Sequence, residues 1–230
     1  NQSFLFEQKI CFNEVSFHYL NTDSDILQKV SFEIKKGEKI GIVGETGSGK
    51  STLVDLILGL LKPNHGSVLI DNKFTAACLQ WHKKIGYVPQ SIYLLDDTIQ
   101  NNILFGDTNP NIDKILKAIN QAQLESFISK LPDGLNTIVG ERGIRLSGGE
   151  RQRIAVARAL YREPEVLIFD EATSALDNET EARLIETINE IGLNRTVIMV
   201  AHRLETLRCC DKIFKVKEGM VKVFSGLKNI

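Results

Sequence analysis

The chain has 230 residues, 43% of them apolar, and its 28 Lys and Arg against 29 Asp and Glu give a formal net charge of −1. This composition is typical of a globular chain and argues against disorder. A charge so close to zero gives no reason to expect a nucleic-acid partner. The sequence contains no run of about 18 uncharged apolar residues, so we expect no direct membrane insertion.

A glycine-rich loop follows the first predicted strands. Alternating apolar and polar residues predict a strand over 30–34, a second strand follows at 40–43, and a helix is expected over 51–61. The loop between the second strand and the helix reads G-E-T-G-S-G-K-S-T, which matches the phosphate-binding (P-loop) pattern G-x-x-x-x-G-K-[ST]. Its candidate nucleotide-binding residues are Gly44, Glu45, Thr46, Gly47, Ser48, Gly49, Lys50, Ser51 and Thr52.

Each part of this loop has a physical role. The glycines let backbone N–H groups turn toward a phosphate, Lys50 supplies a positive charge, and the Ser51 hydroxyl suits Mg²⁺. The loop alone indicates a nucleoside triphosphate and leaves kinases, GTPases and ATPases open. A GTPase would also need an N-K-x-D guanine-binding motif, which the sequence lacks.

The pattern changes after the loop. Residues 98–160 space their apolar positions at helical intervals, which predicts a helical insert. Strand-like runs return at 166–169, 197–200 and 213–216, separated by expected helices at 179–191 and 203–209. Alternating strands and helices indicate an α/β fold with a mostly parallel sheet.

Two carboxylates end the strand predicted at 166–169. Asp170 and Glu171 directly follow four apolar residues, so a buried parallel strand would carry them to the edge of the sheet where the P-loop lies. Asp170 is placed to hold Mg²⁺, and Glu171 to act as general base toward an attacking water. A strand that happens to end in Asp-Glu is common, and the pairing with Lys50 gives this motif its weight.

A third motif, L-S-G-G-E-R-Q at 146–152, opens a helix, and Ser147 with Glu150 also has the spacing of a capping box. With this segment the chain resembles the ATP-binding cassette (ABC) ATPases, whose signature is L-S-G-G-Q/E. Further segments are similar to that family's short motifs, in the family's order. They are V-S-F-H-Y at 15–19, Y-V-P-Q at 87–90, S-A-L-D at 174–177 and A-H-R at 201–203.

The resemblance implies a single nucleotide-binding domain over 1–230, of the P-loop NTPase class. Its RecA-like core would comprise residues 1–90 and 161–230, with an antiparallel β subdomain near the N-terminus and an α-helical subdomain at about 91–160. The cofactors implied are ATP and Mg²⁺. Two such domains would close head to tail around the nucleotide, each copy completing the other's site.

The resemblance also implies a role for each matching residue. The catalytic residues would be Glu171, His202 and Gln90, and the residues that hold Mg²⁺ would be Ser51, Gln90 and Asp170. Tyr19 would stack on adenine, while the opposite copy would contribute Ser147, Gly148, Gly149 and Asp177. Taken singly, His202 also fits a strand-end histidine, Gln90 a turn residue, and Tyr19 or Phe17 a packing residue.

Two further segments indicate the exporter branch of the family. Residues 98–106 are similar to T-I-x-x-N-I-x-F-G, and residues 137–143 to T-E-V-G-E-R-G, with Ile138 in place of the Glu. The chain starts at Asn1, so we expect a longer protein whose transmembrane domain is the partner, at the cytoplasmic face of an inner or plasma membrane. The Lys, Asn and Ile richness is also similar to bacterial flippases of lipid-linked oligosaccharides for protein N-glycosylation. A non-transport ABC ATPase of DNA repair or translation, and a non-hydrolysing regulatory module, remain the alternatives.

Overall fold

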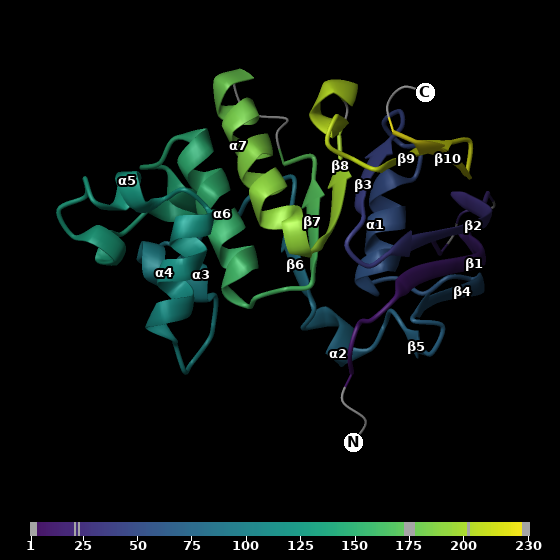
Figure 1. The fold of residues 1–230 in the computed structure, drawn as a ribbon, viewed down its shortest axis with the longest axis horizontal. Helices are drawn as coiled ribbons and strands as arrows, with labels where there is room; N and C mark the ends of the chain where they lie inside the picture. Colours follow the sequence, from purple (N-terminus) through teal and green to yellow (C-terminus); the bar gives the residue numbers. More distant parts are fainter. Residues whose placement is uncertain (1–3, 21, 23, 173–177, 202, 227–230) are drawn as a thin grey trace.

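The computed structural model describes residues 4–20, 22, 24–172, 178–201 and 203–226. It contains an antiparallel sheet built from the N-terminal part of the chain (Figure 1). The strands of this sheet are, in spatial order, β2 (Leu27–Lys35), β1 (Lys9–Phe17), β4 (His65–Ile70) and β5 (Phe74–Thr75). This sheet confirms the antiparallel β subdomain that the family resemblance implies.

A second, larger sheet forms the centre of the molecule. Its strands are, in spatial order, β10 (Met220–Ser225), β9 (Lys212–Lys217), β3 (Lys39–Val43), β8 (Thr196–Val200), β7 (Val166–Asp170) and β6 (Ile85–Val88). All neighbouring strands run parallel except β10, which pairs with β9 in the antiparallel direction. The predicted α/β class with a mostly parallel sheet is therefore confirmed.

Helices cover this central sheet and form a lobe beside it (Figure 1). The α-helices are α1 (Lys50–Leu58), α2 (Leu79–His82), α3 (Ile99–Leu104), α4 (Ile112–Gln121), α5 (Glu125–Ile128), α6 (Gly148–Tyr161) and α7 (Asn178–Ile191). Short 3₁₀ turns are η1 (Gly134–Asn136), η2 (Glu141–Gly143), η3 (Gly192–Asn194) and η4 (Leu204–Leu207). Among the helices that the structure describes, none is long and apolar enough to cross a membrane.

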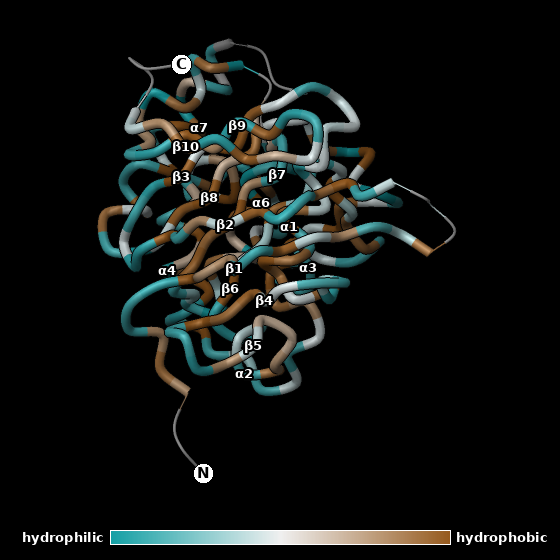
Figure 2. Tube along the Cα trace, turned by 90° about the vertical axis from the view of Figure 1, so that its right-hand side faces the viewer, coloured by the Kyte–Doolittle hydropathy of each residue, from teal (hydrophilic) through white to brown (hydrophobic). Residues whose placement is uncertain are grey.

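The two faces of the central sheet belong to two different hydrophobic cores. In β7, Ile168 packs in a core with α1 and the antiparallel sheet, whereas Leu167 and Phe169 pack in a core with α6 and α7. This alternation follows from the period of two along a strand. Figure 2 shows the apolar strand segments gathered in the middle of the molecule. As a consequence, α1 and α6 lie against opposite faces of the sheet.

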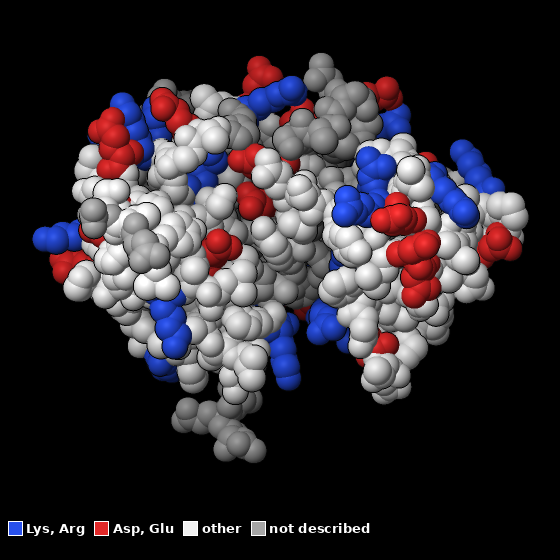
Figure 3. Space-filling view, turned by 180° about the vertical axis from the view of Figure 1, so that it is seen from behind, with Lys and Arg blue, Asp and Glu red and all other residues white. Residues whose placement is uncertain are grey.

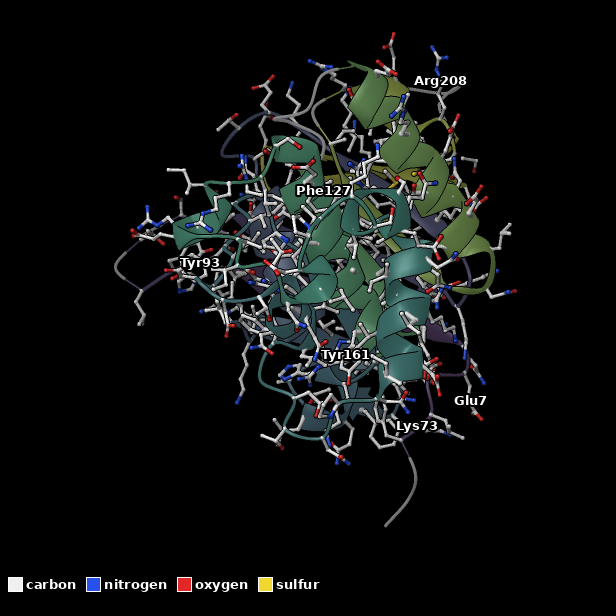
Figure 4. The ribbon with its side chains drawn as sticks, turned by 90° about the vertical axis from the view of Figure 1, so that its left-hand side faces the viewer. Glu7, Lys73, Tyr93, Phe127, Tyr161 and Arg208 are labelled. Atoms are coloured by element: carbon white, nitrogen blue, oxygen red, sulfur yellow. The ribbon has the colours of Figure 1, made fainter. Side chains whose placement is uncertain are left out.

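Side-chain hydrogen bonds connect chain segments in the antiparallel sheet and in the helical lobe. The Asp71 carboxylate accepts the backbone N–H groups of Glu7, Gln8 and Lys9 at 2.7–2.8 Å, which fixes the start of β1 to the turn after β4. In the helical lobe, the Tyr161 hydroxyl donates to Asp107 Oδ2 at 2.7 Å. Tyr161 is labelled in Figure 4. Positive and negative side chains are interspersed over the face in Figure 3, and no extended basic surface is visible there.

Several predicted elements differ from those observed. The helix expected at 203–209 is only the 3₁₀ turn η4, and β1, β5, β6 and β10 have no counterpart among the predicted strands. The ladder of β1 shifts register between Phe12 and Val15, which interrupts the alternation that reveals a strand. The short β6 contains Gly86, and most of β10 is exposed or half-exposed, so neither has a strong apolar pattern.

Candidate functional site

The P-loop connects the buried strand β3 to α1. Gly47 and Gly49 adopt φ angles of +81° and +103°, in the left-handed region that disfavours other residues. At Gly44 a Cβ atom would lie 2.4 Å from the carbonyl oxygen of Val216 and 2.5 Å from Ser48 Oγ. The loop therefore needs glycine at these positions to fold tightly at the end of the strand.

Lys50 is the buried cation of this loop. Its side chain is only 5% exposed, and its Nζ donates to the carbonyl oxygens of Gly44 at 3.0 Å and Glu45 at 3.1 Å. No ion pair to Lys50 occurs in the described part of the chain, and the buried Ser48 Oγ has no hydrogen-bond partner. A buried cation and an orphaned hydroxyl both fit an anionic ligand such as the phosphates of ATP.

Tyr19 connects the end of β1 to the same loop. Its hydroxyl lies 3.3 Å from Thr52 Oγ1, and the Phe17 ring meets its ring edge-on at a centroid distance of 5.0 Å. Tyr19 is 41% exposed, so part of its ring faces solvent. This is a position from which an aromatic ring can stack on a planar base.

Asp170 lies at the carboxyl end of β7, opposite Val200 of β8. It is 9% exposed, and this burial raises the pKa of its carboxyl. The Tyr87 hydroxyl donates to Asp170 Oδ2 at 3.2 Å, which opposes that rise. Burial and the neighbouring Asp170 charge raise the pKa of Tyr87, which therefore stays a protonated donor. The charge of Lys50 also lowers the pKa of Asp170, as expected for two neighbouring groups.

Glu171 follows in a left-handed conformation, with φ +48°, and its backbone N–H donates to the Val200 carbonyl at 3.0 Å. This turn directs the chain away from the strand immediately after Asp170. The Gln90 side chain reaches it from the loop after β6, and Gln90 Nε2 donates to Glu171 Oε2 at 2.5 Å. Three predicted residues, Gln90, Asp170 and Glu171, therefore meet at the ends of two adjacent parallel strands.

Tyr87 is a residue of this site to which the sequence analysis gives no role. Its position in the Y-V-P-Q segment at 87–90 is the available signal, because Tyr87 of β6 pairs with Ile168 of β7, two residues before Asp170. Asp55 of α1 is a second such residue, since its charge also raises the pKa values of Asp170 and Tyr87. Burial raises the pKa of Asp55 itself.

The signature segment begins α6 with the predicted capping box. Ser147 Oγ accepts the Glu150 backbone N–H at 3.3 Å, and the Glu150 carboxylate accepts the Ser147 backbone N–H at 2.7 Å. Gly148 and Gly149 form the first turn of this helix, on the face of the sheet opposite α1. None of the hydrogen bonds between described residues connects 147–149 with the P-loop at 44–52. Asp177 and His202 lie outside the described residues.

The donor set at the end of β7 fits Mg²⁺ held partly by a nucleotide. Among the described residues there is no group of three or more His, Cys, Asp and Glu side chains that could hold a metal alone. Mg²⁺ commonly takes only one or two carboxylates and completes its shell with phosphates and water. Asp170, with the Ser51 hydroxyl at the start of α1, supplies such an incomplete set.

Comparison with known proteins agrees with this geometry. A family model described as "ABC transporter" matches residues 27–174. The chain belongs to the ABC transporter family. It is 46% identical over 214 residues to the leukotoxin translocation ATP-binding protein LktB of Mannheimia glucosida, covering 92% of this chain and 30% of LktB. It is 43% identical over 216 residues to ABC transporter B family member 13 of Arabidopsis thaliana, covering 93% of this chain and 17% of that protein.

A solved structure gives the same result for the fold of this ABC domain. The structure of a bacterial Atm1-family ABC exporter with ATP bound superposes with a TM-score of 0.87 at 38% sequence identity, covering 97% of this chain and 40% of the exporter chain. The chain is thus an ATPase domain of the exporter type. It spans less than half the length of each of these relatives. The relatives favour a transport ATPase over the DNA-repair, translation and regulatory alternatives.

Proposed function

We propose that this ABC domain binds ATP with Mg²⁺ and hydrolyses it to drive export by a longer transporter. The observation that carries the proposal is the meeting of Lys50, Asp170 and Glu171 at one edge of the central sheet, with Gln90 on the Glu171 carboxylate. Phosphoryl transfer to water requires a cation that binds the phosphates, a carboxylate that holds Mg²⁺ and an oriented carboxylate that activates the water.

Each predicted site residue has its own part in this scheme. Lys50 and the N–H groups of residues 44–52 bind the phosphates, and Tyr19 stacks on adenine. Ser51, Asp170 and Gln90 hold Mg²⁺, which neutralises phosphate charge when bound. Glu171 accepts a proton from the attacking water, and Gln90 orients the Glu171 carboxylate. His202 contacts the terminal phosphate.

The site is completed by a second copy of the domain, head to tail. The arrangement is supported by the absence of any hydrogen bond, among the described residues, between 147–149 and the P-loop of the same copy, and by the placement of α1 and α6 against opposite faces of the sheet. Ser147, Gly148 and Gly149 of the second copy then contact the γ-phosphate, and Asp177 lies at the interface between the two copies. We divide the domain into a core, 1–90 and 161–230, and a helical subdomain at about 91–160.

The longer protein supplies the transmembrane partner. The lengths of LktB and of the Atm1-family exporter, of which this chain covers 30% and 40%, support a fused transmembrane domain. The ABC domain then works at the cytoplasmic face of an inner or plasma membrane. Segments 98–106 and 137–143, the second of which contains the exposed Ile138, are the proposed contact with that partner. The similarity to oligosaccharide flippases stays a prediction.

The test measures ATP affinity, together with Mg²⁺-dependent ATP hydrolysis, for the chain and its Lys50→Ala variant. Removing the buried ammonium should weaken ATP binding at least about tenfold, because the phosphates lose a charge-assisted partner. Lys62→Ala, which removes an exposed lysine in the loop between α1 and β4, is the matched control and should bind ATP normally. Equal ATP affinity in the Lys50→Ala variant and the parent chain would contradict the proposed phosphate site.

A further inference from the structure

Polar side chains hold the backbone on either side of Tyr19. β1 ends at Phe17, and its last pair with β4 joins Ser16 to His65. Beyond this pair, the His18 backbone N–H donates to Asn64 Oδ1 at 2.9 Å, and the Asn64 backbone N–H donates to the Ser16 carbonyl at 3.0 Å. The Asn64 side chain therefore accepts the backbone hydrogen bond of His18 that a neighbouring strand would otherwise accept.

The His18 ring has a partner on each nitrogen. Nδ1 lies 3.1 Å from Asp25 Oδ1, and Nε2 lies 3.3 Å from Asn64 Nδ2. An amide nitrogen can only donate, and an ionised carboxylate can only accept. In the neutral ring, these partners place the proton on Nδ1, which donates to Asp25 while Nε2 accepts from Asn64.

The amide of Asn64 cannot be reversed without a loss. If it flipped, its nitrogen would face the His18 backbone N–H, and two donors would oppose each other. Asn64 thus holds His18 by both backbone and ring, and Asp25 holds the ring from the segment before β2. We call His18, Asp25 and Asn64 the His18 clamp. It joins the segment before β2 to the segment before β4.

Tyr19 follows the clamp directly and has its own contacts. Its carbonyl oxygen accepts the Thr22 hydroxyl at 2.8 Å and the Thr22 backbone N–H at 3.2 Å. Its hydroxyl contacts Thr52 at 3.3 Å, so the ring spans from the clamp to the start of α1. A ring that is already held in place loses less conformational freedom when a base stacks on it, so the stacking adds more to the affinity.

We propose that His18 and Asn64 are positioning residues for adenine binding, because the His18 clamp holds Tyr19 where its ring can stack on the base. This inference rests on the proposed function, in which Tyr19 stacks on adenine. Neither residue needs to touch the nucleotide. The clamp acts on affinity for the base and leaves the phosphate contacts of Lys50 unchanged.

The experiment compares Mg²⁺-ATP with Mg²⁺-tripolyphosphate, which has the phosphates and no base, by titration calorimetry on the full chain. We expect His18→Ala and Asn64→Ala each to weaken ATP binding about fivefold, since each removes hydrogen bonds that fix Tyr19. Tripolyphosphate binding should not change. His18→Gln should restore most of the affinity, because its amide can also donate and accept. His65→Ala, at the neighbouring exposed histidine, is the control and should match the parent chain.

Two results would contradict the proposed role of the His18 clamp in adenine binding. One is an equal loss for ATP and tripolyphosphate, which a general structural defect would give. The other is unchanged ATP affinity in His18→Ala while Tyr19→Ala weakens it. Failure of the proposed function looks different, because ATP would then bind no better than tripolyphosphate to the parent chain, or Tyr19→Ala would have no effect. Circular dichroism melting of each variant confirms that it folds.

Discussion

Gln90 Nε2 donates to Glu171 Oε2 at 2.5 Å, although 81 residues separate the two in sequence. The contact exists because β6 and β7 are parallel neighbours, so the segments that follow them emerge side by side. It fixes the direction of the carboxylate that we propose as general base. It also links the loop that precedes the helical lobe to the chemistry at the end of β7.

Replacing Gln90 with Ala should lower the turnover number for ATP hydrolysis about tenfold, because the Glu171 carboxylate loses the donor that orients it. ATP affinity should fall less than the turnover number, since Lys50 and Tyr19 are untouched and Ser51 and Asp170 can still hold Mg²⁺. Steady-state kinetics and a binding titration separate the two quantities. Gln80→Ala, on the exposed face of α2, is the control. An unchanged turnover number for Gln90→Ala would show that this contact has no part in hydrolysis.

Two buried amides should respond oppositely to the same apolar replacement. Asn102 is fully buried, and its side chain accepts from Leu95 and Arg158 and donates to the carbonyls of Leu95 and Thr98, all within 3.1 Å. Gln152 is 6% exposed, and its Nε2 has no hydrogen-bond partner among the residues that the structure describes. Asn102→Leu should lower the free energy of unfolding by about 3 kcal/mol, because it strands several buried groups. Gln152→Leu should leave it unchanged or raise it by up to about 1 kcal/mol.

Urea denaturation of both variants measures this difference. The comparison is matched, since each change introduces the same leucine at a buried position of the helical lobe. A loss for Gln152→Leu as large as that for Asn102→Leu would mean that the Gln152 amide is bonded in solution after all.

Glu163 should make stability depend on acid pH. Hydrogen bonds from Lys117 and Lys114, at 2.7 and 2.9 Å, lower the pKa of Glu163 from 4.5 to about 2. A lowered pKa in the folded state adds stability above the unfolded value, and this is lost as pH falls from about 4.5 toward about 2. The three side chains are more than one third exposed, so the contribution at neutral pH is at most about 1 kcal/mol.

The Glu163→Gln variant tests this origin. It should unfold at slightly lower denaturant concentration at pH 7, and its stability should fall less steeply than that of the parent chain below pH 4.5. Denaturant midpoints measured between pH 3 and 7 give both slopes. Parallel curves for variant and parent would exclude Glu163 as the group responsible.

The sequence predicted those parts of the fold that depend on local patterns. The runs at 40–43, 166–169 and 197–200 are buried on both faces of a parallel sheet, so their continuous apolar character reveals them. The P-loop and the carboxylates after β7 were predictable for the same reason, since both follow such strands directly.

The remaining features depend on which distant segments become neighbours. The hydrogen bond from Tyr87 to Asp170 needs the β6–β7 pairing, and the His18 clamp needs the register between β1 and β4. Neither pairing has a signature in the local pattern, because β1 is interrupted by register shifts and β6 has only 4 residues. These contacts depend on which strands pair and in which register, and local sequence patterns do not reveal either.

The central claim is that Glu171 is the general base of an ATPase that works as a head-to-tail pair. The most direct measurement is turnover and ATP-dependent self-association of Glu171→Gln, by a phosphate-release assay and analytical ultracentrifugation. The variant keeps the size of the side chain and one acceptor oxygen for Gln90, and it removes the basicity of the carboxylate. Our account predicts a turnover at least about 100-fold below that of the parent chain, with ATP binding retained and a dimer formed on ATP addition. Hydrolysis at the parent rate would contradict it.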